Sequence, residues 1–204
     1  MRIGFDIDGV LANFIPAYQR LTCEITGRNL FHPNDDTDPP CWNWPEYRGY
    51  TATEMARVWS AIKKSPDIWL SLQETPHCST LRLCVFDLQR FHDVYFVTNR
   101  PGLDAKWQTE QWLILHLGIE RPTVLISSMK GLVAKVLKLD CYLDDNLDNA
   151  NDVILVTHLY DDGKTIPTRM YLLNKSYNHN GLSDCRITRV DTLGQFLDKE
   201  LVNL

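Results

Sequence analysis

The sequence predicts an α/β fold organised around a parallel sheet. Short apolar runs of strand length alternate along the chain with longer segments of helical periodicity, and polar residues directly follow several of the apolar runs. Strands that are separated by helices pair in parallel, because a helical crossover returns the chain to the same end of the sheet. The 204 residues correspond to one domain, or to one domain that carries an insertion.

The first part of the chain combines a strand, a helix and a loop. An apolar run at residues 3–5 has the length of a buried strand, and residues 14–26 have the composition of a helix that stops at Gly27. Residues 28–50 contain four prolines and little periodicity, which predicts a loop.

A capping box begins the next helix. Thr51 is followed three residues later by Glu54, and at this spacing each side chain accepts a hydrogen bond from the backbone N–H of the other residue. One face of the helix is apolar and carries Met55, Val58, Trp59 and Ile62. We therefore expect these four side chains, including Trp59, to be buried in the core of this region.

The second part of the chain alternates helices with strands. Helices are expected at residues 79–91, 104–117 and 130–137 and after Thr192. Strands are expected at residues 94–97, 123–126, 141–143, 153–157, 170–173 and 187–190. This alternation is typical of a parallel sheet with helices packed on it.

The spacing of the first two strands indicates an insertion. Residues 3–5 and 94–97 are much farther apart than the crossover of about a dozen residues that joins parallel strands. We therefore expect a core domain at residues 1–13 and 81–204, with residues 14–80 inserted after the first strand.

Composition and charge exclude several classes of protein. The formal net charge of −5 at pH 7 argues against a broad basic surface, so no stable complex with nucleic acid is expected. No apolar stretch approaches the roughly 18 residues of a membrane span, and the N-terminal residues lack the apolar segment of a secretion signal. The six cysteines form no C-x-x-C pair, which predicts reduced thiols in a cytoplasmic protein without structural zinc.

Polar side chains gather where four predicted strands end, at the edge where an open parallel sheet binds its ligands. They are Asp6 and Asp8, then Thr98, Asn99 and Arg100, then Lys130, and finally Asp144 and Asp145. Clustered carboxylates resist ionisation unless a positive charge lies among them. Mg²⁺, a hard cation that takes oxygen ligands, is therefore the expected cofactor, and a small phosphorylated molecule is the expected substrate.

Four segments of the chain resemble, in order, the motifs of the haloacid dehalogenase superfamily. Asp6-Ile7-Asp8-Gly9-Val10 resembles the first motif, Thr98 the second, Lys130 the third and Leu143-Asp144-Asp145 the fourth. The forms D-I-D-G-V-L-A, F-V-T-N-R-P and Y-L-D-D-N are most similar to the 5′(3′)-deoxyribonucleotidases and their phage and bacterial relatives. The resemblance implies a Rossmann-like parallel sheet with a small helical type 1 cap inserted after the first strand.

The resemblance also implies a role for each motif residue. Asp6 would be the nucleophile that forms an aspartyl-phosphate, and Asp8 would be the general acid for the leaving group and then the base for water. Thr98 and Lys130 would bind the phosphoryl oxygens.

The implied metal site combines the carboxylate of Asp6, the backbone carbonyl of Asp8 and the carboxylate of Asp145. Asp145 is preferred over Asp144 because it aligns with the aspartate of a common family form, Gly-Asp at a strand end, but the choice between the two stays open at this point. Asn99 and Arg100, next to Thr98, would contact the substrate, whereas Asp148 and Asp152 are expected to be solvated helix residues.

The insertion lies where the superfamily places a type 1 cap, which closes over the site and selects the leaving group. Trp42 and Trp44 lie in its polar, proline-rich loop and are the candidates for stacking on a nucleobase. The alternative is that these rings form the core of a small cap.

The sequence therefore predicts a Mg²⁺-dependent phosphatase that acts through an aspartyl-phosphate, as a 5′-nucleotidase for (deoxy)nucleoside monophosphates. The alternatives within the same chemistry are a sugar-phosphate phosphatase and a phosphatase for 3′-phosphate ends of nucleic acid. A phosphorylated receiver is rejected, because receivers carry the phosphorylated aspartate after a middle strand. An inactive relative is disfavoured, because no motif position is substituted. Residues 158–204 carry no motif, and the oligomeric state stays open, with a homodimer as one option.

Overall fold

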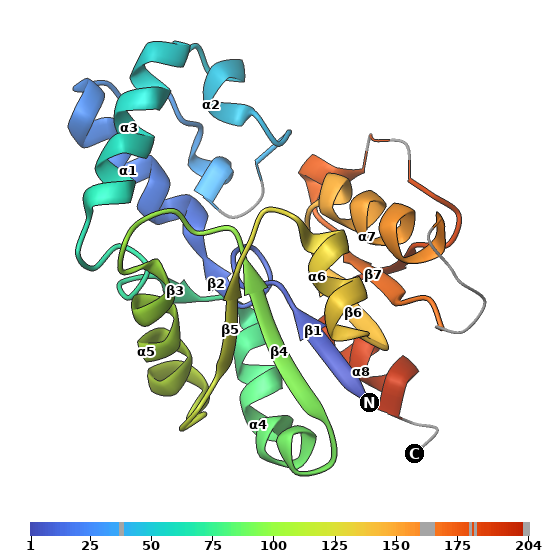
Figure 1. Ribbon diagram of the computed structural model, residues 1–204. Helices are drawn as coiled ribbons and strands as arrows, with labels where there is room; N and C mark the ends of the chain where they lie inside the picture. The colour runs from blue at the N-terminus through green and yellow to red at the C-terminus, as the bar shows by residue number, and fades with distance from the viewer. Residues whose placement is uncertain (37–38, 160–165, 180, 182, 202–204) are drawn as a thin grey trace.

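A six-stranded parallel sheet forms the centre of the molecule (Figure 1), in a computed structural model that describes residues 1–36, 39–159, 166–179, 181 and 183–201. The strand order is β5-β4-β1-β6-β7-β8, and every neighbouring pair is parallel. The strands are β1 (Arg2–Phe5), β4 (Asp93–Thr98), β5 (Thr123–Ile126), β6 (Cys141–Asp144), β7 (Arg169–Leu173) and β8 (Thr188–Val190). The predicted α/β fold is confirmed.

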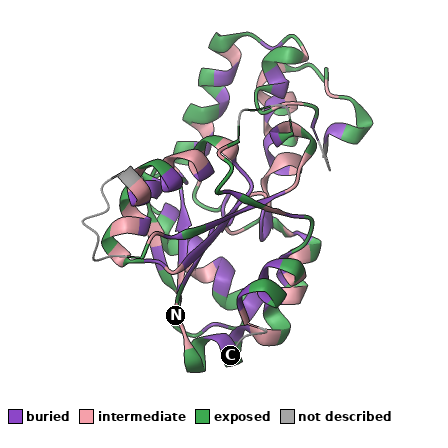
Figure 2. Ribbon diagram, turned by 90° about the vertical axis from the view of Figure 1, so that its right-hand side faces the viewer, coloured by how far each residue is buried: buried purple, intermediate pink, exposed green. Residues whose placement is uncertain are grey.

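Helices cover both faces of this sheet. One face packs against α4 (Pro76–Phe91), α5 (Ala105–Leu117) and α8 (Leu193–Leu201), and the other against α6 (Lys130–Leu137) and α7 (Leu147–Leu159). Successive strand residues point to opposite faces, so Phe96 joins the first core cluster and Val97 joins the second. Figure 2 shows the central strands buried between helices whose outer sides are exposed. Among the described residues, no helix has the length and apolar character needed to cross a membrane.

A smaller helical layer projects beyond the carboxyl ends of the strands (Figure 1). It contains α1 (Phe14–Thr26), the 3₁₀ helix η1 (Pro33–Asp36), α2 (Trp44–Tyr47) and α3 (Ala52–Lys64). The chain leaves and re-enters the core through an antiparallel ribbon in which β2 (Ala12–Asn13) pairs with β3 (Gln73–Glu74). We call the described residues between 14 and 72 the cap.

Local signals set the ends of the two long cap helices. Helix α1 stops at Gly27, whose positive φ of 69° gives the left-handed conformation that glycine adopts without steric cost. Helix α3 starts at Thr51, whose hydroxyl accepts a hydrogen bond from the backbone N–H of Glu54, while the Glu54 carboxylate accepts one from the backbone N–H of Thr51. The capping box predicted from the sequence is therefore present.

Three sequence expectations about secondary structure need correction. Residues 153–157, expected as a strand, lie in α7, where Val153 and Ile154 are buried and Leu155 is exposed. The β-branched residues favour a strand, but a short apolar run does not distinguish a strand from a helix that covers a sheet. Residues 28–50 are not loop throughout, because η1 and α2 lie within them, and α4 begins three residues before the expected residue 79.

Candidate active site

A cleft of about 550 Å³ is lined on one side by cap residues and on the other by residues at the carboxyl ends of the strands. The core side of the cleft includes six residues predicted from the sequence, Asp6, Asp8, Thr98, Asn99, Lys130 and Asp145. The cap side is lined by aromatic rings, those of Phe14, Tyr18, Trp42, Trp44, Trp59 and Trp69. A more open hollow of about 670 Å³, lined in part by Met1, Arg2 and Asp93, contains none of these residues.

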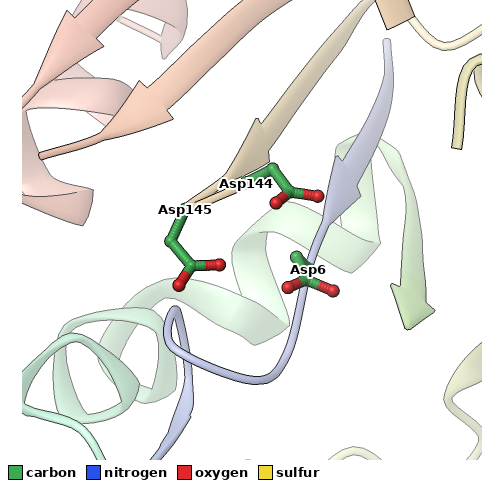
Figure 3. A group of neighbouring side chains, drawn as sticks. All are labelled: Asp6, Asp144 and Asp145. Atoms are coloured by element: carbon green, nitrogen blue, oxygen red, sulfur yellow. The ribbon is translucent and has the colours of Figure 1, made fainter. Parts of the chain in front are cut away.

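Three buried aspartates form the centre of the site (Figure 3). Asp6 directly follows β1, and Asp144 and Asp145 stand at the end of β6. Phe5 pairs with Leu143 in the register of these neighbouring parallel strands, so the residues that follow reach the same edge of the sheet. Oxygen atoms of the three carboxylates lie within 4.8 Å of one another. The cluster offers only oxygen ligands, the donors that Mg²⁺ takes in proteins.

Gly9 allows Asp145 to approach the loop after β1. Its φ of +84° is in the left-handed region, and a Cβ atom at this position would lie 1.9 Å from Oδ2 of Asp145. Any larger residue at position 9 would therefore displace the carboxylate of Asp145.

Lys130 places a positive charge inside the cluster. Its Nζ lies 2.6 Å from Oδ1 of Asp6 and 3.5 Å from Oδ2 of Asp144. The ammonium also donates hydrogen bonds to the hydroxyl of Tyr142, at 2.9 Å, and to the backbone carbonyl of Val97. These contacts hold the ammonium beside the carboxylate that the sequence predicts to be the nucleophile.

The start of the helix that carries Lys130 is fixed by Asp152. The backbone N–H of Gly131 donates a hydrogen bond of 2.7 Å to Oδ2 of Asp152. A Cβ atom on Gly131 would lie 2.5 Å from the backbone oxygen of Asp152, so helices α6 and α7 are in close contact here. The expectation that Asp152 is merely solvated was wrong, whereas Asp148 is exposed at the edge of the cleft.

The clustered carboxylates resist ionisation, because they are buried and outnumber the ammonium of Lys130. Burial raises the pKa of Asp6 well above its usual value, Lys130 opposes this rise, and repulsion from Asp144 and Asp145 adds to it. Burial and the charge of Asp144 raise the pKa of Asp145 to about 7. Burial alone would lower the pKa of Lys130, but Asp6 and Asp144 raise it above its usual value. Three carboxylates with one ammonium therefore fit a site that gains a further cation.

The raised pKa of Asp145 predicts a specific pH dependence of stability in the metal-free protein. The pKa of Asp145 is about 7 in the folded chain, against about 3.9 for an unperturbed aspartate. Between these values the folded state binds more protons than the unfolded state, so the free energy of unfolding falls as pH rises. The stabilising contribution is complete below about pH 4 and is lost as pH passes about 7.

Urea unfolding in EDTA between about pH 4 and 8 measures this effect. The Asp145→Asn variant, which has no proton to release, is expected to show a flatter stability profile than the parent protein. An equally steep profile in that variant would show that other groups cause the pH dependence.

Asp8 lies apart from the three clustered aspartates and is held by a buried arginine. Arg100 donates one hydrogen bond from Nε to Oδ2 of Asp8, at 2.9 Å, and a second from Nη2 to Oδ1 of Asp8, at 2.8 Å. The hydroxyl of Thr98 lies 3.2 Å from the same Oδ2. Arg100 in turn donates to the hydroxyl of Thr109 and lies 5.1 Å from the ring centre of Trp69. The bidentate pair fixes Asp8 at the wall of the cleft.

The predicted substrate-binding residues differ in where the structure places them. Asn99 lines the cleft, but Arg100 does not, because its fully buried guanidinium lies behind Asp8.

The tryptophans of the cap differ in their exposure. Trp42 is 58% exposed at the cleft. Trp44 lines the cleft but is largely buried, and its indole N–H has no hydrogen-bond partner among the residues that the structure describes. Trp59, expected in the core, is 38% exposed and stacks on Phe14 at the cleft wall.

Two contacts to Asp145 come from the region that carries no sequence motif. In the 3₁₀ helix η2 (Ser176–Asn178), the Tyr177 hydroxyl donates to Oδ2 of Asp145. Nδ2 of Asn178 donates to the backbone carbonyl of Asp145 at 2.8 Å. No pattern within residues 158–204 indicated these contacts, because they depend on where β7 and the segment after it lie beside β6.

Asn149 donates hydrogen bonds to both carboxylate oxygens of Asp144. The D-D-N-x-x-N spacing of the sequence is compatible with this contact, but we did not predict it.

No protein-family model and no curated protein sequence matches the chain. Solved structures do match it. A haloacid dehalogenase-like hydrolase from Burkholderia xenovorans shares 10% sequence identity over 96% of this chain and 94% of its own, with a TM-score of 0.55. A dehalogenase solved with an intermediate complex shares 10% identity over 97% of this chain and 96% of its own, also at 0.55. A family IA haloacid dehalogenase hydrolase from Entamoeba histolytica shares 10% identity over 99% of this chain and 97% of its own, with a TM-score of 0.52.

These similarities extend over nearly the whole chain, and at 10% identity they concern the fold. The strand order, the layer inserted after β1 and the acidic cluster at the strand ends had been established independently of them. The chain therefore has the fold of the haloacid dehalogenase-like hydrolases.

Proposed function

We propose that the protein is a Mg²⁺-dependent phosphatase that hydrolyses phosphate monoesters through a phosphorylated Asp6. The observation that carries this proposal is the contact of a buried carboxylate, Asp6, with the buried ammonium of Lys130 at the base of the cleft. The ammonium and a bound cation together offset the charges of the aspartates and of a phosphate dianion. The fold supports the proposal, because it is shared with hydrolases.

The residues of the site fit Mg²⁺. The proposed ligands are the carboxylates of Asp6 and Asp145 and the backbone carbonyl of Asp8. Asp145 lines the cleft, whereas Asp144 is fully buried and accepts hydrogen bonds from Asn149. This difference favours Asp145 as the direct ligand and Asp144 as a supporting charge. When bound, Mg²⁺ supplies charge neutralisation for the phosphoryl group during transfer.

The proposed reaction consists of two displacements at phosphorus. A carboxylate oxygen of Asp6 bonds to phosphorus while the bond to the ester oxygen breaks, and the leaving oxygen takes a proton from Asp8. Asp8 then removes a proton from water, the water oxygen bonds to phosphorus, and the bond to Asp6 breaks. Inorganic phosphate and the alcohol leave, and water is the only co-substrate. Thr98 and Lys130, which line the cleft, bind the phosphoryl oxygens.

The proposed substrates are (deoxy)nucleoside monophosphates. Six aromatic rings line the cap side of the cleft, and flat rings offer the faces on which a nucleobase stacks. Trp42 and Trp59 present the exposed rings among the tryptophans of this wall. A sugar phosphate is the second candidate, because the cleft also contains Glu46, Asp148 and Asn149, whose side chains accept hydrogen bonds from sugar hydroxyls.

A phosphate-release assay over nucleoside monophosphates, sugar phosphates and a 3′-phosphorylated oligonucleotide tests this function. We expect release from nucleoside monophosphates in Mg²⁺ and loss of that release in excess EDTA. Full activity in EDTA would refute the metal dependence. Preferential release from sugar phosphates would select the second candidate, and no release from any ester would reject the phosphatase proposal.

Replacing Trp42 by alanine is expected to raise KM for a nucleotide more than for a small aryl phosphate. Stacking grips the part of the substrate that does not react, so kcat should change less than KM. The loss per stacked base is about 1–3 kcal/mol. Steady-state kinetics on both substrates measure the difference, with Trp107→Ala as the control, because Trp107 is 53% exposed on α5 and does not line the cleft.

The largely buried Trp44 serves as a second comparison. Because the ring of Trp44 packs between Tyr18 and Phe31, we expect Trp44→Ala to lower the Tm and to affect all substrates alike. Equal losses on nucleotide and aryl phosphate for Trp42→Ala would contradict nucleobase stacking.

A further inference from the structure

We propose that Tyr177 is a positioning residue that links the carboxylate of Asp145 to the cap. The inference rests on the proposed function, because it assigns Asp145 to the metal site. It concerns a residue far from every sequence motif, on a segment that follows β7.

The first half of the link is the contact between Tyr177 and Asp145. The Tyr177 hydroxyl donates a hydrogen bond to Oδ2 of Asp145, the same oxygen that Gly9 leaves room for. Asn178 holds the backbone carbonyl of Asp145 and donates to the carbonyl of Leu173 at 2.8 Å. Both the carboxylate and the main chain of Asp145 are thus bound by neighbouring residues of η2.

The segment that carries Tyr177 is itself anchored in the core. Arg189, on β8, donates to Oδ1 of Asn178 at 3.1 Å and to its backbone carbonyl at 2.8 Å. The backbone N–H of Lys175 donates to the same Oδ1 at 3.2 Å. These hydrogen bonds hold η2 against β8, and they thereby fix the position from which the hydroxyl of Tyr177 contacts Asp145.

The second half of the link is the contact between Tyr177 and the cap. The ring of Tyr177 meets the ring of Trp42 edge to face, with centres 5.6 Å apart. Both rings line the cleft. A movement of the Trp42 loop therefore changes the packing of the side chain whose hydroxyl binds Asp145. The position of the cap is in this way coupled to the orientation of a metal ligand.

Magnesium binding to the substrate-free protein tests the inference without reference to turnover. Outer hydrogen bonds to a metal-binding carboxylate typically change metal affinity by about 10–100-fold. We expect Tyr177→Phe, which keeps the ring but removes the hydroxyl, to weaken Mg²⁺ binding about tenfold by calorimetric titration. At saturating Mg²⁺, the KM for a small aryl phosphate should stay close to that of the parent protein.

Tyr171→Phe is the matched control. It also removes a tyrosine hydroxyl that donates to a carboxylate, that of Glu200 at 2.5 Å, but this contact lies outside the cleft. We expect Tyr171→Phe to lower Tm without changing the affinity for Mg²⁺. A general loss of stability would therefore not imitate the expected result.

A double-mutant cycle tests the connection to the cap. Trp42→Ala should weaken Mg²⁺ binding in the parent protein but have no further effect in the Tyr177→Phe background, because its influence passes through the missing hydroxyl. Unchanged Mg²⁺ affinity in Tyr177→Phe, or an equal effect of Trp42→Ala in both backgrounds, would overturn the inference while leaving the phosphatase proposal intact. A parent protein that neither binds Mg²⁺ nor releases phosphate would reject the proposed function, and the inference with it.

Discussion

Replacing Asp6 by asparagine is expected to reduce phosphate release by roughly 10⁴-fold or more, because an amide is not an anionic nucleophile. The fold should survive. Burial and the neighbouring aspartates raise the pKa of Asp6, so the charged side chain is unfavourable in the metal-free protein. Asparagine removes that charge at nearly the same volume. We therefore expect the Tm of Asp6→Asn in EDTA to be no lower than that of the parent protein.

Asp8→Asn is the informative comparison for this variant. Loss of general acid–base catalysis typically costs about 10²–10⁴-fold, and the carboxylate of Asp6 is still present to accept a phosphoryl group. Rapid-quench measurements should therefore find covalently phosphorylated protein with Asp8→Asn but not with Asp6→Asn. Near-normal turnover by Asp6→Asn would remove the basis of the proposed mechanism.

Replacing Lys130 by methionine is expected to affect both activity and stability. The change leaves the buried carboxylates of Asp6 and Asp144 without their cation, and removing one partner of a buried ion pair costs about 3–5 kcal/mol. The Tyr142 hydroxyl and the Val97 carbonyl also lose a donor. Without the ammonium the acidic cluster is more negative, so we expect the variant to bind Mg²⁺ more tightly than the parent protein. Because Mg²⁺ binds only the folded site, the loss of stability should then be smaller in Mg²⁺ than in EDTA. Urea unfolding under both conditions measures this difference.

Lys106→Met serves as the control for the Lys130 variant. Lys106 pairs with Glu110 on the surface of α5, and its side chain is 59% exposed. An exposed pair of this kind contributes about 0.2–1 kcal/mol, so the control should remain close to the parent protein in stability and turnover. Equal effects of the two substitutions would show that Lys130 is not the charge that makes the acidic cluster tolerable.

The sequence was most informative where a local pattern and a chemical requirement coincide. Strands β4 and β5 and helix α6 were predicted to within a residue or two, because each is a short periodic run with clear ends. The residues after the strands were also identified, since a polar group directly after a buried strand must face the edge of a parallel sheet. Asp6 and Asp145 reach one cleft for this reason, and Lys130 reaches the same cleft from the start of α6.

Local patterns were least informative about which residues a side chain contacts in the folded protein. Asp8 has the same side chain as Asp6 and lies close to it in the sequence, yet it pairs with Arg100 outside the acidic cluster. Trp44 was as good a stacking candidate as Trp42 by sequence, but it packs inside the cap, whereas Trp59, on an apolar helix face, reaches the cleft. Burial of a ring in a small cap depends on which neighbouring elements cover it.

The sequence by itself determined the fold class and the identity of the acids and the lysine that follow the strands. These depend on periodicity and on residues that lie close together along the chain. Only the tertiary structure decided that η2 returns to Asp145, that Tyr177 meets Trp42, and that residues 153–157 are helical. The two contacts join residues that are far apart in the chain, and the helix covers a sheet formed by distant strands. All three features depend on strand order and register, which no short segment encodes.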